Sequence, residues 1–351
     1  MKIAVVSNMF PDKRYPSYGV FVKNFCNILD ELGIQHKDHV MLKSSSKVEK
    51  IARYLKFYVG TFFALLFEQY DLIYVHYASH SSIPVLLAHK LRKKIVYTNV
   101  HGSDVVPQNL SQEKMQRYTK RIIKLSNKII VPSDFFKEVV SEKYCVDRHK
   151  IFVSPSGGID NTKFFMLDYN NEKTDILTLG FVSRIEQGKG LDILLKACSQ
   201  LSVLYKLIIV GSGTEKNRMK ELSMTLGIDK NIQWIDLQPQ EKLRELYNKM
   251  DVFIFPSELQ ESLGLVAIEA MACGTPVIAS DFAAPKYYID EGVNGLKFKC
   301  GNDKSLKEAI ERFNKIDKDE KKMMVKGALE TASRYNVSTI KEDMRRILEI
   351  K

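Results

Sequence analysis

Short apolar runs alternate with longer segments of helical character along the whole chain, and this alternation limits the possible folds more than any other feature. Runs such as 2–7 and 251–255 are mostly apolar, as expected of parallel strands buried on both faces. Strands that alternate with helices predict a parallel sheet, so the predicted fold class is α/β with one sheet in each half. The expected strands are 2–7, 71–76, 94–98, 127–131, 150–153, 176–182, 205–210, 232–235, 251–255 and 276–279.

The length of 351 residues is typical of two domains or one large one. A Ser/Pro/Gly cluster at 154–158 and a polar segment at 168–174 interrupt the alternation of strands and helices. Such composition is typical of a linker. We therefore expect an N-terminal domain at 1–160 and a C-terminal domain at 174–335.

The chain is basic, with a net charge of +11. This charge leaves three kinds of partner open, namely nucleic acid, an anionic membrane surface and small phosphorylated ligands. The five cysteines are odd in number and irregularly spaced, which favours free thiols in a reducing cytosol over disulfides. We expect no metal site and no signal peptide, and the longest apolar run, 57–67, is too short to span a bilayer.

The segment 43–69 combines basic and aromatic residues and allows two interpretations. Its lysines and arginine interleave with Tyr and Phe, so a helix here could lie on an anionic membrane surface. Alternatively, the helix packs on the sheet and its basic face is solvated. The second interpretation predicts burial on nearly all sides of 57–67, because that stretch is apolar nearly all round.

The segment 256–272 offers a site for a phosphorylated ligand. Glu261 and Glu269 lie eight residues apart, so on one helix both carboxylates would face the same side, roughly 12 Å apart. Ser262 and Gly264 are small and leave backbone N–H groups accessible at the helix start, where a phosphate can bind. This arrangement suits a nucleotide-sugar, with its diphosphate in the middle and hydroxyl groups on each carboxylate.

Cations follow a strand end in the second half of the chain. Arg184 and Lys189 lie on one loop, where they could neutralise a diphosphate without a metal ion as negative charge develops on the leaving group. The alternative is that both are ordinary exposed cations.

Histidines and a glycine mark strand ends in the first half. His101 follows a strand and precedes Gly102 and Asp104, so it could donate a hydrogen bond to a phosphate or a sugar hydroxyl. We expect His76 and His80 to be structural histidines with satisfied hydrogen bonds. Gly19, at a helix entrance, could admit a phosphate to the backbone or could serve the turn alone; both readings stay open.

These motifs together resemble the family 4 retaining glycosyltransferases with the GT-B fold. The resemblance covers nearly the whole chain, from residue 1 to about 300, and the motifs occur in the order of that family. The matching pieces are His101-Gly102-Ser103-Asp104, Ser183-Arg184-Ile185 with Lys189-Gly190, Val210-Gly211-Ser212-Gly213, Phe255-Pro256-Ser257, Glu261 with Glu269, and Ala270-Met271-Ala272-Cys273-Gly274-Thr275-Pro276-Val277-Ile278.

The resemblance implies two Rossmann-like domains that face each other across a cleft, with the nucleotide-sugar held mainly by the second. It also implies that a last helix, at 336–351, crosses back to the first domain. One departure is Ser154-Pro155-Ser156-Gly157-Gly158-Ile159-Asp160, where the family often has Pro-Asn-Gly-Val-Asp.

The resemblance assigns roles to single residues. Glu261 would contact the donor sugar and Glu269 the ribose hydroxyls. Arg184 and Lys189 would hold the diphosphate, and His101 would lie near the sugar. The backbone of three further residues would hold phosphate, namely Ser262, Leu263 and Gly264.

The expected function is transfer of a sugar, with retention of anomeric configuration, from a UDP- or GDP-linked donor to a saccharide or polyprenyl-diphosphate-linked acceptor. By family habit this transfer would serve capsule, O-antigen or other surface glycan synthesis in the cytoplasm, at the inner face of the membrane. No cofactor besides the donor substrate is expected. The alternatives are an enzyme similar to UDP-N-acetylglucosamine 2-epimerase and, from the charge alone, a nucleic-acid-binding protein, although no nucleic-acid-binding module is found.

Overall fold

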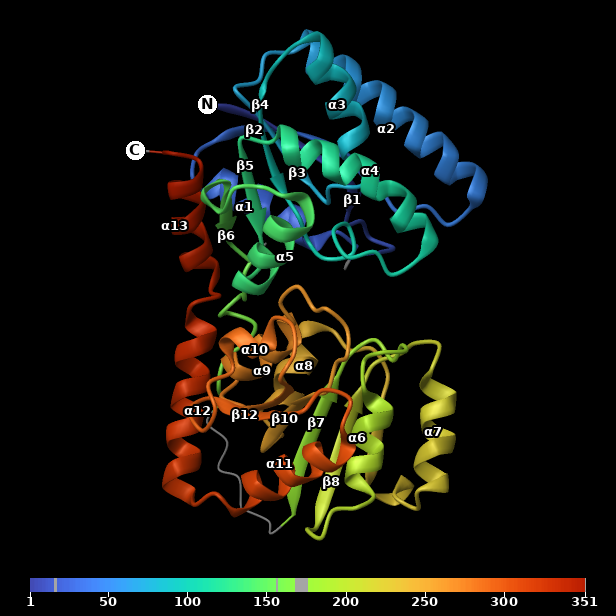
Figure 1. The fold of residues 1–351 in the computed structure, drawn as a ribbon, viewed down its shortest axis with the longest axis vertical. Coiled ribbons are helices and arrows are strands. Elements are labelled where there is room, and N and C mark those ends of the chain that lie inside the picture. The colour runs from blue at the N-terminus through green and yellow to red at the C-terminus, as the bar shows by residue number, and fades with distance from the viewer. Residues whose placement is uncertain (16–17, 156, 168–175, 351) are drawn as a thin grey trace. The chain divides into compact units, whose positions relative to one another are not determined.

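The computed structural model describes residues 1–15, 18–155, 157–167 and 176–350, and the chain divides into two compact units (Figure 1). Unit 1 comprises residues 1–158 and the residues from Ile340 onward, and unit 2 comprises Ile159–Thr339. The sequence places the first boundary at 160 and the start of the last helix at 336. Two parts of the expected linker, Ser156 and 168–174, lie outside the described residues.

The sheet of unit 1 has six strands in the order β2-β1-β3-β4-β5-β6, and its pairings are parallel, which confirms the prediction for this half. The sequence does not predict β2, because most of its residues are polar. Polar residues are tolerated there, since β2 is an edge strand that pairs with β1 alone among the described strands. The strands are β1 (Lys2–Phe10), β2 (Gln35–Leu42), β3 (Leu72–His76), β4 (Ile95–Asn99), β5 (Lys128–Val131) and β6 (Ile151–Val153).

The helices of unit 1 bury one apolar face each against this sheet. Val22, Phe25 and Leu29 of α1 are buried, as are Ile122 and Ile123 of α4. The helices are α1 (Val20–Glu31), α2 (Lys47–Phe67), α3 (Ser82–Leu91), α4 (Leu110–Leu125) and α5 (Asp134–Tyr144), with a 3-10 turn at Arg148–Lys150.

The last helix, α13 (Val337–Ile347), contributes most of its residues to unit 1. The Tyr74 hydroxyl of β3 lies 3.9 Å from the Met344 sulfur, and Lys128 pairs with Glu349 just after the helix at 2.5 Å. The C-terminal segment thus completes the core of the unit in which the chain began.

Helix α2 corrects one prediction. Burial on nearly all sides of 57–67 is wrong, because only Phe57, Thr61 and Leu65 of the whole helix are buried. Phe63 and Phe67 are 49% and 77% exposed. The reason is that α2 packs against β2 and α3 with one face, which leaves the opposite face uncovered by the described residues.

The sheet of unit 2 also has six strands, in the order β12-β11-β10-β7-β8-β9, with parallel pairings. The prediction of a second parallel sheet is confirmed, although the sequence did not predict β12. Buried aliphatic side chains of β7, β8 and β10 form the core together with α6 and α11. The strands are β7 (Leu177–Val182), β8 (Tyr205–Val210), β9 (Ile232–Ile235), β10 (Val252–Phe255), β11 (Val277–Ser280) and β12 (Gly295–Phe298).

The helices of unit 2 follow its strands in alternation, as Figure 1 shows, up to a helical pair at the end of the unit. Among the described residues, no helix of either unit is long and apolar enough to cross a membrane. The helices are α6 (Leu191–Cys198), α7 (Lys216–Thr225), α8 (Gln240–Tyr247), α9 (Leu265–Ala272), α10 (Pro285–Tyr288), α11 (Asp303–Lys315) and α12 (Lys318–Ser333), with a 3-10 turn at Asp229–Asn231.

Candidate functional site

The strand order of unit 2 reverses between two neighbouring strands, β7 and β10. The chain proceeds from β7 to β8 and β9 on one side, and from β10 to β11 and β12 on the other. In open parallel sheets the loops that leave the carboxyl ends of the strands diverge at such a point and form a ligand crevice. The loops 183–190 and 256–264 leave the sheet here, and they carry most of the predicted donor-binding residues.

Close backbone contacts hold these two loops together. The Glu258 N–H donates to the Gly188 carbonyl at 2.8 Å. Gly190 begins α6 with a φ of 75°, and a Cβ atom there would lie 1.9 Å from the backbone oxygen of Pro256. Only glycine permits this approach, since other residues rarely adopt such a φ and their side chain would overlap the Pro256 carbonyl.

Lys189 and Glu261 form an ion pair between these loops. The Lys189 Nζ atom lies 2.5 Å from the Glu261 Oε1 atom, and the Ser257 hydroxyl donates to the same oxygen at 2.8 Å. The side chains of Lys189 and Glu261 are 14% and 18% exposed. The structure therefore brings together two predicted site residues in a largely desolvated position, where each is available to a ligand only if the pair separates.

The position of Glu261 differs from the prediction. Helix α9 begins at Leu265, after Gly264, which has a φ of 83°, so Glu261 lies on the preceding loop and not on the helix. The expectation that Glu261 and Glu269 share one helix face is wrong. The left-handed backbone of Gly264 turns the chain sharply just before the helix, which the eight-residue spacing alone could not reveal.

The proposed phosphate cradle lies at this turn. A Cβ atom on Gly264 would lie 2.9 Å from the Phe255 ring and 3.2 Å from the Tyr288 hydroxyl, so the turn is tightly packed from inside. Leu263 is buried and Ser262 is partly exposed, so Leu263 could offer a ligand only its backbone. The first turn of α9 carries no acidic residue, which leaves its positive dipole end unopposed there. Phosphate binding here stays a prediction.

Glu269 lies within α9 and has a hydrogen-bond partner that the sequence did not predict. The Tyr247 hydroxyl, at the end of α8, donates to Glu269 Oε2 at 3.0 Å. Burial of the carboxyl group raises the pKa of Glu269 to about 7, and the hydrogen bond from Tyr247 opposes this rise. Glu269 is thus poised to change its charge near neutral pH, and a ligand whose hydroxyl groups donate to it would favour the ionised form.

Arg184 does not join this cluster. Its side chain is exposed, and it forms no ion pair within the described part of the chain. A role of Arg184 in diphosphate binding stays a prediction.

In unit 1 two histidines meet at the ends of neighbouring strands. His76 Nδ1 lies 3.2 Å from His101 Nε2, and the His101 ring packs on Phe21 with 3.9 Å between centroids. Burial lowers the pKa of His101 to about 3, so the imidazole is neutral at physiological pH. His76 was expected to be fully hydrogen-bonded. This is wrong, because its buried Nε2 has no partner among the described residues. His80, by contrast, lies 2.7 Å from the Tyr58 hydroxyl.

Asp104 fixes the backbone around His101. Its carboxylate is buried and accepts hydrogen bonds from the N–H groups of Ala78, His101 and Gly102 at 2.8, 3.0 and 2.9 Å. Burial raises the pKa of Asp104, while these backbone donors lower it. Asp104 therefore orders the loop and does not face a ligand. In the sequence, only its place in the motif around His101 indicated that it could be important.

Gly19 is explained by the backbone alone. It precedes α1 with a φ of 73°, and a Cβ atom there would lie 2.6 Å from the backbone of Met9. Of the two interpretations that the sequence leaves open, the requirement of the turn for glycine is sufficient to explain Gly19. A role of Gly19 in donor binding remains a prediction without support from the described contacts.

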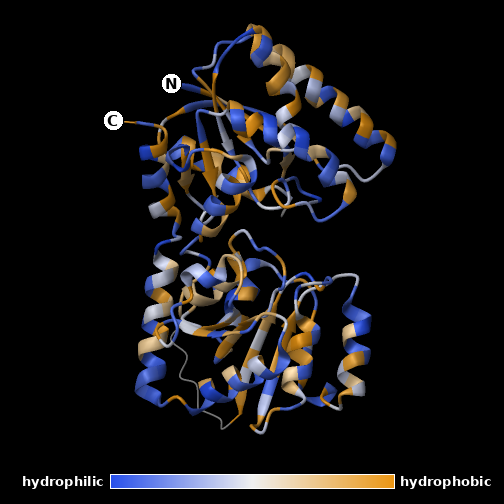
Figure 2. Cartoon of the chain, in the orientation of Figure 1, coloured by the Kyte–Doolittle hydropathy of each residue, from blue (hydrophilic) through white to orange (hydrophobic). Residues whose placement is uncertain are grey.

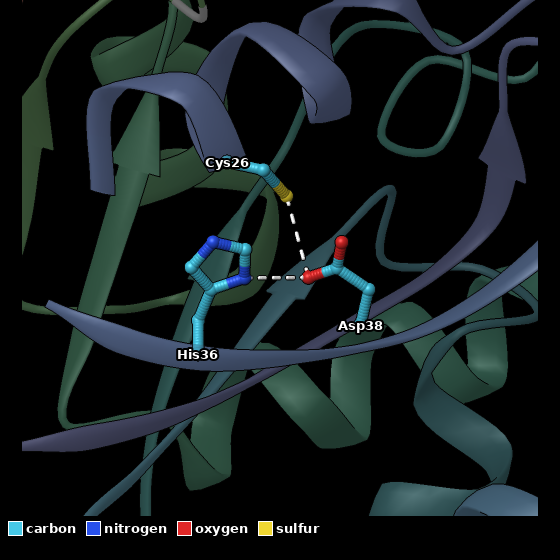
Figure 3. A group of neighbouring side chains, drawn as sticks. All are labelled: Cys26, His36 and Asp38. Carbon is cyan, nitrogen blue, oxygen red and sulfur yellow. Dashed lines mark hydrogen bonds and ion pairs between the residues drawn. The ribbon is translucent and has the colours of Figure 1, made fainter. Parts of the chain in front are cut away.

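Cys26, His36 and Asp38 form a side-chain group that their sequence spacing did not suggest (Figure 3). The Cys26 thiol lies 3.5 Å and the His36 Nδ1 atom 2.8 Å from Asp38 Oδ1, and Asp30 lies 3.1 Å from His36 Nε2. Metals bind the thiolate form of cysteine, whereas burial raises the pKa of the Cys26 thiol. The group is therefore best explained as a hydrogen-bonded tether between α1 and β2.

Two family models match the chain. One, described as Glycosyltransferase Family 4, matches residues 31–160, and the other, described as Glycosyl transferases group 1, matches residues 165–330. The two matches fall in unit 1 and unit 2, respectively, with the boundary between them near residue 160.

Among curated proteins, the D-inositol 3-phosphate glycosyltransferase of Nocardia farcinica is 29% identical over 253 residues, which are 65% of this chain and 55% of that protein. The protein of the same name from Corynebacterium urealyticum is 29% identical over 294 residues, 76% of this chain and 68% of that protein. The chain thus spans about half the length of the first of these relatives, at 55%.

Solved structures resemble the chain over nearly its full length. Sucrose-phosphate synthase from Thermosynechococcus elongatus matches with a TM-score of 0.81 at 20% identity, covering 99% of this chain and 98% of that one. Anabaena Alr3699/HepE in complex with UDP and glucose matches with a TM-score of 0.73 at 19% identity, covering 99% of each chain. At these identities the likeness concerns the fold.

Proposed function

The chain belongs to the family 4 glycosyltransferases and has their GT-B fold, and from this premise we propose that it transfers a sugar from a nucleotide-diphosphate sugar to an acceptor. The observation that supports this best is the Lys189–Glu261 ion pair at the point where the strand order of unit 2 reverses. A diphosphate requires a positive charge and a sugar hydroxyl requires a hydrogen-bond acceptor, and the cation and the carboxylate of this pair supply both.

Donor binding would proceed by exchange of partners. The diphosphate displaces Glu261 from Lys189, and Glu261 then accepts hydrogen bonds from the donor sugar. Arg184 and the backbone of Ser262 to Gly264 add positive potential at the phosphates. The exchange keeps each charged group paired or hydrogen-bonded at every stage, which matters because a charge without partners is costly in a desolvated site.

Glu269 would bind the ribose of the nucleotide. Its carboxylate can accept two hydroxyl donors, and the Tyr247 hydroxyl already holds one of its oxygens. UDP- and GDP-sugars share this ribose, so Glu269 does not select between them. The Anabaena protein, whose structure contains UDP, makes a uridine nucleotide the first donor class to test.

The chemical step in this proposal retains the anomeric configuration and needs no metal ion. The acceptor attacks the same face of the sugar from which the phosphate departs, and the phosphate oxygen takes the acceptor proton. Glu261 acts as a hydroxyl ligand and not as a nucleophile in this proposal, since Ser257 still donates to its carboxylate after Lys189 has turned to the diphosphate. His101, as a neutral imidazole, hydrogen-bonds a sugar hydroxyl. The anomeric configuration of the product, determined by NMR, tests this step, and an inverted product contradicts it.

The proposed acceptor is a saccharide, either free or carried on a polyprenyl diphosphate, used in capsule, O-antigen or other surface glycan synthesis. A solved structure similar to this chain is described as a lipopolysaccharide outer core galactosyltransferase, with a TM-score of 0.75 at 16% identity. An enzyme with such an acceptor would work in the cytoplasm at the inner face of the membrane, so an anionic membrane surface is a further proposed partner.

A thermal-shift panel of UDP-, GDP- and ADP-sugars tests the proposal directly. We expect one donor class to raise the Tm of the wild-type protein but not of Glu269→Ala. Glu330→Ala, which removes an exposed carboxylate from α12, is the matched control and should respond like the wild type. If no nucleotide-sugar stabilises the wild type, or if Glu269→Ala responds equally, the proposed site is wrong.

A further inference from the structure

The outward face of α2 carries a continuous apolar stripe. Its members follow one another at intervals of three or four residues, the spacing that places side chains on one face of a helix. They are 45% to 80% exposed, and the helix of 21 residues is about 30 Å long. The stripe comprises Val48, Ile51, Leu55, Val59, Phe63 and Phe67.

The stripe continues onto the neighbouring helix α3. Leu87 and Leu91 of α3 are 49% and 71% exposed, and α3 packs beside α2. Between the helices lies a groove of about 390 Å³, lined by Tyr58, Val59, Phe62, Phe63, Leu87, Lys90 and Leu91. Hydrophobic colour recurs along both helices in Figure 2. The stripe, Leu87 and Leu91 are called the α2–α3 face below.

Cations lie at both ends of the α2–α3 face. Lys47, Lys50 and Lys56 are exposed in the N-terminal half of α2, and Lys90 and Lys93 are exposed at the end of α3. Within the described part of the chain these five lysines form no ion pair, whereas Arg53 of α2 pairs with Glu49 at 2.6 Å. A partner of the α2–α3 face must therefore offer apolar groups and negative charge together.

We propose that the α2–α3 face lies in the interface of an anionic lipid bilayer, with α2 parallel to the membrane plane. Acyl chains cover the apolar stripe while lipid headgroups neutralise the lysines, which is the pattern of interfacial amphipathic helices. A second copy of the chain fits less well, because it would bring two sets of lysines against each other. This membrane contact rests on the proposed function in one respect, since a polyprenyl-linked acceptor would then lie in the same bilayer.

Vesicle co-sedimentation of the full-length protein tests this inference. We expect binding to phosphatidylcholine vesicles that contain phosphatidylglycerol, and little binding to pure phosphatidylcholine. Phe67→Ser should weaken partitioning about tenfold, because one exposed aromatic side chain no longer enters the bilayer. Lys50→Gln should weaken it about fivefold, an effect that disappears at high salt.

Matched control variants lie in unit 2. Met323 is 74% exposed, close to the 77% of Phe67, so Met323→Ser removes a similar apolar side chain from another surface. Lys304→Gln, on α11, is the corresponding charge control, because Lys304 is exposed and, like Lys50, forms no ion pair with a described residue. Neither control should change vesicle binding, and all four variants should keep the donor-induced thermal shift of the wild type.

Three results would overturn the inference. They are equal binding to neutral and anionic vesicles, equal losses in Phe67→Ser and Met323→Ser, and a dimer by light scattering that Phe67→Ser dissociates. The proposed enzymatic function fails separately, since it depends on nucleotide-sugar binding, which is measured without vesicles.

Discussion

Replacement of Glu269 by glutamine is expected to stabilise unit 2 at alkaline pH. The folded protein raises the pKa of Glu269 from 4.5 to about 7, so the native state holds this proton more tightly than the unfolded state. The stability contributed by the protonated carboxyl is fully present below pH 4.5 and is lost as the pH rises through about 7. At pH 8 the wild-type protein therefore carries a buried carboxylate at a net cost.

The magnitude follows from this pKa difference. A rise from 4.5 to about 7 corresponds to at most about 3 kcal/mol of unfolding free energy. We expect most of this value, about 2 kcal/mol, as the gain in unfolding free energy for Glu269→Gln at pH 8. Glutamine has nearly the same shape and still offers an oxygen to the Tyr247 hydroxyl. At pH 5 the gain should be much smaller, because the Glu269 carboxyl group is then protonated in the folded protein and only the unfolded chain still ionises it.

Urea unfolding at pH 5 and pH 8 measures this effect in the right part of the molecule. The chain has one tryptophan, Trp234, which lies on β9 and packs on the core of unit 2. Its fluorescence therefore reports the unfolding of the unit that contains Glu269. The reasoning is refuted if Glu269→Gln is no more stable than the wild type at pH 8, or if the gain is the same at both pH values.

Glu261→Gln is the contrasting variant in the same segment. It breaks the pair with Lys189, whose side chain is only 14% exposed, and leaves that ammonium group without its counter-ion. We expect a loss of about 1 kcal/mol at pH 8, opposite in sign to the effect of Glu269→Gln. Both variants should lose donor binding. Glu269→Gln is therefore expected to gain stability while it loses function, whereas Glu261→Gln should lose both.

Three further outcomes are expected. Tyr247→Phe removes a hydrogen bond that lowers the pKa of Glu269, so the pH midpoint of donor affinity, measured by calorimetry around pH 7, should move to higher pH. Gly190→Ala should destabilise unit 2 by more than about 2 kcal/mol in urea unfolding, whereas Gly227→Ala, with a similar φ but nothing within 4 Å, should lose only about 1 kcal/mol. His101→Asn should lower turnover about tenfold by the same factor at pH 6 and pH 8, because the pKa of His101 is about 3 and the wild-type imidazole is neutral at both.

The strand–helix alternation in the sequence was sufficient to predict both parallel sheets, because buried parallel strands need continuous apolar runs. It failed for β2, whose polar residues lie at a sheet edge, and for α2, whose two sides are both apolar although only one is buried. Apolar character predicts what a helix can bury, but the number of neighbouring elements decides what it does bury.

The candidate site was predictable only in part for a related reason. Lys189 and Glu261 were found from motifs, and their loops meet because β7 and β10 are neighbours. Their direct pairing and the hydrogen bond from Ser257 depend on the path of the loop 256–264 before α9, which residue spacing cannot specify. Tyr247 gave no signal at all, since it reaches Glu269 from another helix, 22 residues earlier in the chain.

The contact between Gly190 and Pro256 has a consequence for how such an enzyme can change its donor. The two loops share one packed boundary with no room for a side chain, so neither can lengthen or shift without moving the other. In the proposed donor site, mutations in one loop that alter sugar preference are then expected to need compensating changes in the other. Engineering of donor selectivity should therefore exchange 183–190 and 256–264 as a single cassette.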